Sequence, residues 1–228
     1  DIIFHTAALA STQKSKENPY LFHDHNVNGT LRILEFAKKN NIPIIFSSSS
    51  SVLHSTFTSA YGLQKKICED YFKLYRELYG LRYVILRYFN VYGEREPNEG
   101  IHKTVVSIFL RQKKEGKPFT IVGDGNQRRD FVYVKDVVDA NIKAMRYLLS
   151  NVNSQNRTFE IGSGDNYSIN ELADFIDKNH SRTFLPYRQE PYATLCDWDE
   201  AKDILEWQPK TDLQTWIKQN EAFSKRKP

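Results

Sequence analysis

The 228-residue sequence contains little cysteine and no long hydrophobic run. Its two cysteines, Cys68 and Cys196, cannot build a disulfide framework, so we expect a reducing, cytoplasmic compartment. No apolar run approaches the roughly 20 residues that span a bilayer, so we expect no membrane partner. The six histidines are scattered and no Cys-x-x-Cys motif occurs, so we expect no metal site.

The sequence also lacks a strong excess of charge of one sign. The formal net charge is +4, and 26% of the residues are charged. An excess this small suits a phosphate-bearing small molecule as well as nucleic acid. The basic tail Lys225-Arg226-Lys227 is a short terminal run of a kind that is usually solvated, so we expect no nucleic-acid partner.

What the sequence does contain is an alternation of strand and helix patterns. The apolar stretches 2–8, 42–48 and 82–88 are typical of strands, and residues 18–39 and 60–78 between them have helical spacing. Buried strands separated by helices predict parallel pairing in an α/β sheet. Further strands are predicted at 119–122, 131–134, 158–161 and 182–187, and further helices at 102–115, 135–149, 168–179, 199–206 and 212–223.

Candidate chemistry lies at the start of the predicted helix 60–78. Tyr61 and Lys65 are four residues apart and therefore share a helix face, and Tyr61 follows Ser49 by 12 residues. The three side chains would meet at the carboxyl end of a parallel sheet, where open α/β folds bind ligands. A phenol titrates near pH 10, so it needs a nearby cation to act as a base, and Lys65 supplies most of that effect. The buried face of this helix is predicted as Leu63, Ile67, Tyr71 and Leu74.

Short motifs follow one another in order along the whole chain. They are His5-Thr6-Ala7-Ala8, Asn26-Val27-Asn28-Gly29-Thr30, Phe46-Ser47-Ser48-Ser49, Tyr61 with Lys65, Arg87-Tyr88-Phe89-Asn90-Val91-Tyr92-Gly93, Gly123 to Val137, Ile161-Gly162-Ser163-Gly164 and Leu205-Glu206-Trp207-Gln208-Pro209. With these motifs the chain resembles the extended short-chain dehydrogenase/reductase family, and the nucleotide-sugar 4-epimerases within it.

The resemblance implies a site for two ligands. It makes Ser49, Tyr61 and Lys65 catalytic and implies NAD as the cofactor, bordered by Ala7, Ala8, Asn26, Ser47, Tyr61, Lys65 and Phe89. It implies a nucleotide sugar, most readily a UDP-sugar, held by Asn90, Thr120, Val122, Arg129 and Arg188. The arginines would hold the diphosphate, because their planar forks of donors match its oxygens, and Thr120 and Val122 would flank the base. The resemblance also implies a homodimer.

The implied fold is α/β, with a partial Rossmann-type doubly wound parallel sheet and a smaller α/β substrate-binding domain. Residues 1–93 and 131–162 would form the NAD-binding domain, and 94–130 and 163–228 the nucleotide-sugar domain. The implied reaction is epimerisation at C4 through a transient 4-keto sugar. A dehydratase, a decarboxylase, a reductase or an inactive fragment that binds nucleotide sugar are the alternatives. Dehydratases carry Thr-Asp-Glu where this chain has Ser49-Ser50-Ser51, which disfavours dehydration.

Two departures from the family pattern accompany the resemblance. None of the ten glycines forms the Gly-x-x-Gly-x-x-Gly turn that opens the family's first strand. We therefore expect the chain to be part of a longer protein, preceded by about two βα units, on the order of 60 residues. The spacing from Ser49 to Tyr61 is short for the extended branch of the family but normal for the shorter branch, so the triad can still close; a trimmed loop is one explanation and would alter substrate access.

Overall fold

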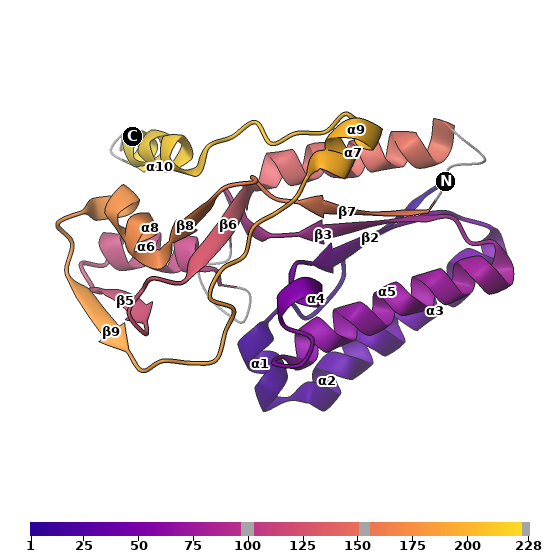
Figure 1. The fold of residues 1–228 in the computed structure, drawn as a ribbon, viewed down its shortest axis with the longest axis horizontal. Helices are drawn as coiled ribbons and strands as arrows, with labels where there is room; N and C mark the ends of the chain where they lie inside the picture. The colour runs from indigo at the N-terminus through magenta and orange to yellow at the C-terminus, as the bar shows by residue number, and fades with distance from the viewer. Residues whose placement is uncertain (97–102, 151–155, 225–228) are drawn as a thin grey trace.

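The computed structural model describes residues 1–96, 103–150 and 156–224, except the side chains of 220–224. Two predictions lie outside the described residues: the basic tail 225–227, and residue 102 of the helix predicted at 102–115. At its centre is a parallel sheet in the order β1-β2-β3-β7 (Figure 1). The strands are β1 (Ile3–His5), β2 (Ile44–Ser49), β3 (Tyr83–Tyr88) and β7 (Arg157–Ile161). The arrangement confirms the predicted α/β fold with a Rossmann-type sheet.

Helices cover both faces of this sheet, as Figure 1 shows. On one face lie α3 (Gly29–Asn40) and α5 (Ala60–Tyr79), and on the other α7 (Val134–Ser150) and α9 (Asp199–Leu205). Neighbouring strand residues point to opposite faces, so Phe46 and Ile85 pack with α3 and α5 while Ile45 and Leu86 pack with α7. Burial on both faces explains why the strands read as continuous apolar runs.

The segment between β1 and α3 differs from the single helix predicted at 18–39. Helical structure begins earlier, with α1 (Thr12–Glu17), α2 (Pro19–His23) and the π-helical turn η1 (Asp24–Asn28) before α3. Pro19 has no backbone N–H, so it starts a new helix, which the Asn18 side chain caps. The predicted end is correct, because Asn41 takes a left-handed conformation with φ 52°.

A second group of elements lies beside the central sheet. It contains a sheet of β4 (Asn90–Tyr92), β6 (Arg128–Tyr133) and β8 (Asn166–Ser168), and the pair β5 (Phe119–Val122) with β9 (Arg182–Leu185). The helices α6 (Val105–Lys114), α8 (Ile169–Asp177) and α10 (Leu213–Ser224) accompany them. Phe109, Phe119, Phe131 and Leu172 belong to a core separate from that of the central sheet. This separate core is compatible with the predicted domains, whose boundaries stay a prediction.

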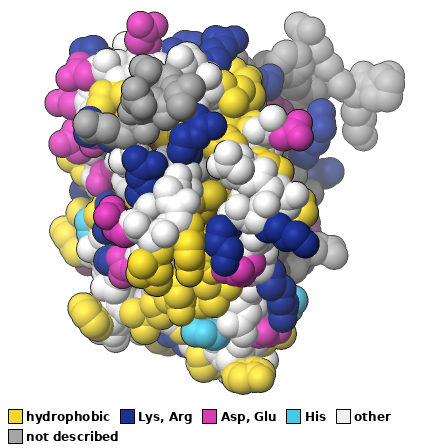
Figure 2. Space-filling model, turned by 90° about the vertical axis from the view of Figure 1, so that its right-hand side faces the viewer, with side chains coloured by type: hydrophobic (Ala, Val, Ile, Leu, Met, Phe, Trp, Pro, Cys, Tyr) yellow, Lys and Arg dark blue, Asp and Glu magenta, His cyan; other side chains and the backbone are white. Residues whose placement is uncertain are grey.

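The buried face of α5 was predicted only in part: Ile67 and Tyr71 pack, partly buried, against the core, but the two leucines do not. Leu63 and Leu74 are 43% and 45% exposed, whereas Lys65 and Glu69 are among the residues that α5 buries. The polar side chains can be buried because both find partners on the strands beneath them. Figure 2 shows that hydrophobic side chains also gather on the molecular surface, among lysines and arginines. No helix in the described part of the chain is both long and apolar enough to cross a membrane.

Candidate active site

A cavity of about 720 Å³ opens beyond the carboxyl ends of β2 and β3. One wall is formed by α1, by α4 (Ser51–His54) and by the first turn of α5, and the other by β5, β6 and the segment 185–194. The cavity brings together most of the predicted catalytic and substrate residues. Those that line it are Ser49, Tyr61, Asn90, Thr120, Val122, Arg129 and Arg188, together with Phe89, which was predicted to border NAD; Lys65 is not among the lining residues.

Tyr61 is fixed by the hydrogen bonds that start α5. The Ser59 side chain accepts a hydrogen bond from the Gly62 N–H as the helix cap, and the buried Ser15 hydroxyl accepts one from the Tyr61 N–H at 3.0 Å. Tyr61 itself is 7% exposed. Burial raises the pKa of Tyr61 to about 12, outweighing the hydrogen bond with Ser49 that lowers it. The phenol is therefore protonated in the protein alone, and the expectation that Lys65 nearly suffices to ionise it was wrong.

Lys65 lies one helical turn below Tyr61, between α5 and β2. Its Nζ donates to the Ser47 carbonyl oxygen at 2.7 Å and lies 4.6 Å from the centroid of the Phe46 ring. Its distance from the centroid of the Tyr61 ring is 6.0 Å. Burial lowers the pKa of Lys65 to about 8, against the opposing effects of Cys68 and Glu69. An ammonium has three donors and only one hydrogen bond of Lys65 is found among the described residues, so the group can still serve a bound ligand.

The residues predicted to border NAD fall into two groups. Ala7 is exposed and Ala8 half-buried just after β1, and Phe89 lines the cavity, so these can face a ligand. Asn26 and Ser47 instead bond within the protein. The Asn26 amide binds the Leu9 backbone and Gln64, and the Ser47 hydroxyl lies 3.1 Å from the Tyr88 hydroxyl. Asn26 therefore holds the loop after β1 in place and is not among the cavity-lining residues.

The arginines predicted for the diphosphate share one carboxylate. Arg129 Nη2 and Arg188 Nε lie 3.4 Å and 3.5 Å from the same oxygen of Glu190. The side chain of Arg129 is 12% exposed and that of Arg188 is 49% exposed. The Glu190 carboxylate thus occupies the place between the two guanidinium groups that a phosphate would need. The pairing of Glu190 with these arginines was not predicted, although Glu190 stands two residues after Arg188.

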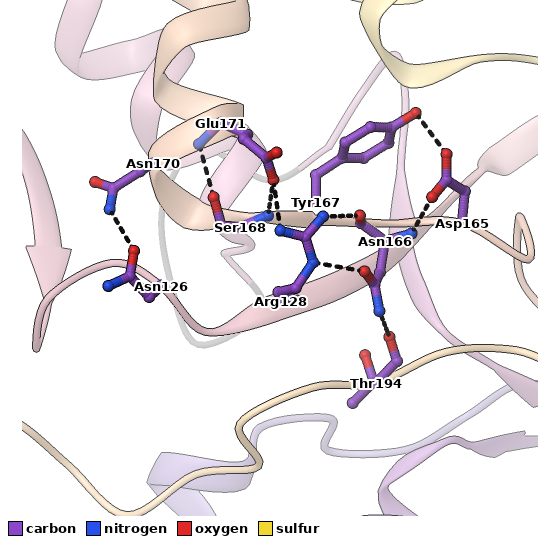
Figure 3. A network of polar contacts seen from close by, with 9 residues as sticks. All are labelled: Asn126, Arg128, Asp165, Asn166, Tyr167, Ser168, Asn170, Glu171 and Thr194. Carbon is purple, nitrogen blue, oxygen red and sulfur yellow. Dashed lines mark hydrogen bonds and ion pairs between the residues drawn. The ribbon is translucent and has the colours of Figure 1, made fainter.

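The neighbouring Arg128 is structural. Its guanidinium donates to the side chain and the backbone of Asn166 and pairs with Glu171 at 3.0 Å (Figure 3). Asn166 in turn donates to the Thr194 carbonyl oxygen, and Glu171 forms a capping box with Ser168 at the start of α8. Because Thr194 lines the cavity, this network holds one of its walls against β6 and β8. Alternation along β6 separates the roles of Arg128 and Arg129.

Further basic side chains line the cavity. Lys14 and Lys16 on α1, His54 at the end of α4, and Lys103 contribute further nitrogen groups to the cavity. Lys14 and Lys16 belong to the helix that the sequence pattern did not reveal, so no periodicity pointed to them. The described residues contain no group of three histidine, cysteine or acidic side chains that could hold a metal ion.

Comparisons with known proteins show which family the chain belongs to. The family model for the NAD dependent epimerase/dehydratase family matches residues 1–162, and the chain belongs to that family. A curated relative, a putative UDP-glucose 4-epimerase of Methanocaldococcus jannaschii, is 38% identical over 239 residues, which cover 96% of this chain and 75% of the relative.

Solved structures of nucleotide-sugar epimerases share the fold. The UDP-glucose 4-epimerase of Thermotoga maritima with UDP-glucose has a TM-score of 0.88 and 32% identity, covering 98% of this chain and 77% of the other. The UDP-glucuronic acid 4-epimerase of Bacillus cereus, in complex with UDP-glucuronic acid and NAD, has a TM-score of 0.83 and 28% identity, covering 96% and 76%.

Proposed function

We propose that the chain carries the substrate site and the catalytic residues of an NAD-dependent enzyme that inverts a nucleotide sugar at C4 through a transient 4-keto sugar. The observation that carries the proposal is one cavity that holds Ser49 and Tyr61 on one side and Arg129 and Arg188 on the other. A proton-transfer group and a diphosphate-binding pair therefore face the same space. The family and the epimerase relatives support this assignment.

Tyr61 takes the proton of the sugar 4-hydroxyl and later returns it, while the Ser49 hydroxyl hydrogen-bonds the reacting oxygen. NAD, when bound, supplies the chemistry that oxidises the sugar carbon and reduces it again. Lys65 places a positive charge beside the phenol and retains free donors for the hydroxyls of a ligand. Ala7, Ala8 and Phe89 are the residues placed to border the cofactor.

The substrate follows from the arginines. A diphosphate brings about two negative charges, which Arg129 and Arg188 can neutralise with bidentate hydrogen bonds. The Glu190 carboxylate has to leave the space between them, because two anions cannot share it without strong repulsion. Asn90, Thr120 and Val122 line the same cavity, and we assign Thr120 and Val122 to the base and Asn90 to the diphosphate.

The test is turnover of purified protein containing this chain, supplied with NAD and separately with UDP-glucose, UDP-N-acetylglucosamine and UDP-glucuronate. We expect a C4-inverted product from at least one, and loss of about 10²- to 10⁴-fold in kcat for Tyr61→Phe. Release of carbon dioxide from UDP-glucuronate would instead identify a decarboxylase. Binding of UDP-sugar without turnover would identify the inactive, sugar-binding alternative.

We also propose that the protein forms a homodimer through α5. Leu63, Leu74 and Leu78 are 43%, 45% and 60% exposed, and their spacing places them along one side of the helix. A two-fold axis beside α5 would bury this stripe against its copy. Leu74→Lys should convert the dimer to a monomer in light scattering; an unchanged mass would contradict this interface. The two buried free thiols support a reducing, cytoplasmic location.

A further inference from the structure

Glu69 is a buried carboxylate to which the proposed function has given no role. It lies two helical turns beyond Tyr61 and one beyond Lys65, on the same face of α5. Its side chain is 0% exposed, and it is absent from the cavity lining. A buried charge of this kind is costly unless it is paired and fully hydrogen-bonded, so its surroundings show what holds it there.

Glu69 clamps α5 to two strands at once. One oxygen accepts a hydrogen bond from the Ser48 hydroxyl at 2.7 Å and one from Arg87 Nε at 3.0 Å. The other oxygen accepts one from Arg87 Nη2 at 2.7 Å, which completes a bidentate ion pair. Ser48 and Arg87 are paired neighbours in the parallel register of β2 and β3, so one carboxylate fixes the helix over both strands.

The clamp lies directly beside the contacts of Lys65. Ser47, the residue before Ser48, supplies the carbonyl oxygen to which Lys65 donates at 2.7 Å. A shift of α5 along β2 would therefore break the Ser48 contact and the Lys65 contact together. Glu69 also places a negative charge one helical turn from the Lys65 ammonium, where it favours the charged form of that lysine.

We propose that Glu69 is a positioning residue for the reaction: its clamp on Ser48 and Arg87 sets the place of Lys65 beneath Tyr61, and its carboxylate places a negative charge one helical turn from the Lys65 ammonium. The inference rests on the proposed epimerase function. It assigns to Glu69 an action through Lys65 and no contact with the substrate. The ionisable groups that face Lys65 and Glu69 from α5 and the elements packed against it are Tyr61, Cys68, His5, Tyr83 and Arg87.

The test compares Glu69→Gln with the wild type in the epimerase assay across pH. Gln keeps the shape and the Ser48 contact but removes the charge, so the half-buried Arg87 loses its ion pair with residue 69. We expect kcat to fall at least about tenfold with KM little changed, because Glu69 lies outside the cavity. We expect the alkaline limb of the kcat profile to move down by about one pH unit, because Lys65 loses its proton more easily.

Asp70→Asn is the matched control. It makes the same chemical change on the next residue of α5, where the exposed Asp70 pairs, among the described residues, with Lys66 and Lys73. This variant should keep the wild-type kcat and profile. If the alkaline limb of the Glu69→Gln enzyme does not move, even where kcat and the melting temperature fall, the role of Glu69 is merely structural and the proposal is overturned.

If Glu69→Gln does not fold, Glu69→Asp decides the question. Asp keeps the charge but is one methylene shorter, so it cannot reach Ser48 and Arg87 together. We expect a lower kcat with the alkaline limb in place, and a wild-type kcat would refute the clamp. Failure of the wild type to invert any nucleotide sugar would instead refute the proposed function, so the two failures are distinguishable.

Discussion

The ionisation of Tyr61 offers a direct test of how this site works. The structure raises the pKa of Tyr61 to about 12, whereas a general base for neutral pH needs a value near 7. A difference of about 5 in pKa corresponds to about 7 kcal/mol. Lys65 lies 6.0 Å from the phenol ring, where a unit charge at an effective dielectric near 20 contributes about 3 kcal/mol. Lys65 alone is therefore insufficient, and the bound ligands have to supply the remainder.

We accordingly predict that Tyr61 does not ionise in the free protein below about pH 10. The measurement is the ultraviolet absorbance of tyrosinate during an alkaline titration, taken as the wild-type spectrum minus that of Tyr61→Phe. The difference should stay at zero from neutral pH to about pH 10. The same subtraction with Tyr20→Phe, at a side chain that is 85% exposed, verifies that the method detects a single phenol.

A phenolate that appears near pH 7 without any ligand would refute this reasoning, because burial would then not dominate the electrostatics of the site. The pH dependence of folding stability gives a second check on the same residue. A pKa raised from 10 to about 12 stabilises the folded protein below pH 10, and that contribution, about 3 kcal/mol at most, is lost as pH rises from 10 to 12. Tyr61→Phe should lose less stability over that range.

Three further predictions concern other parts of the structure. Burial, aided by Lys65, lowers the pKa of His5 to about 4, so on acidification the unfolded chain binds the proton before the folded protein does. Between pH 7 and pH 5 the free energy of unfolding, measured with urea, should therefore fall by about 2 kcal/mol more in the wild type than in His5→Gln. Equal falls would contradict this. Arg129→Gln should weaken UDP binding in calorimetry by about 30-fold or more, since it removes half of the arginine pair; an unchanged affinity would exclude Arg129 from the phosphate site. A Cβ at Gly62 would lie 2.7 Å from the Ser55 carbonyl oxygen, so Gly62→Ala should lower the free energy of unfolding by about 1–3 kcal/mol and raise KM. The control is Gly29→Ala, where an added Cβ has nothing within 4 Å and should not destabilise the protein in thermal unfolding.

The elements of the fold were largely predictable because their signals are local. The bounds of β5 and α5, the left-handed end at Asn41 and the capping box of Ser168 each follow from a few neighbouring residues. The short strands β4 and β8, of three residues each, are set by pairing with β6 and have no pattern of their own. The start of the helical segment after β1 was missed because α1 has no apolar period.

The orientation of α5 and the contacts of the arginines could not be predicted, because both depend on residues distant in sequence. Periodicity favoured the leucine stripe as the buried face, and nothing local shows that Lys65 and Glu69 have partners on β2 and β3. In the same way, the pairing of Arg129 with Glu190 joins residues 61 positions apart. The cavity does bring Ser49 and Tyr61 together, because their spacing relative to strand and helix ends fixes their positions, and their catalytic role stays a prediction.

The serine run at the end of β2 has a consequence for how the protein tolerates change. Ser47 meets Tyr88 with its hydroxyl and Lys65 with its carbonyl oxygen, Ser48 meets Glu69, and Ser49 reaches the cavity. Three identical side chains thus have three different sets of contacts. A shift of the strand register by one residue would turn each serine to the opposite face of the sheet. An insertion or deletion within this run should therefore abolish activity even though the sequence would still read as serines.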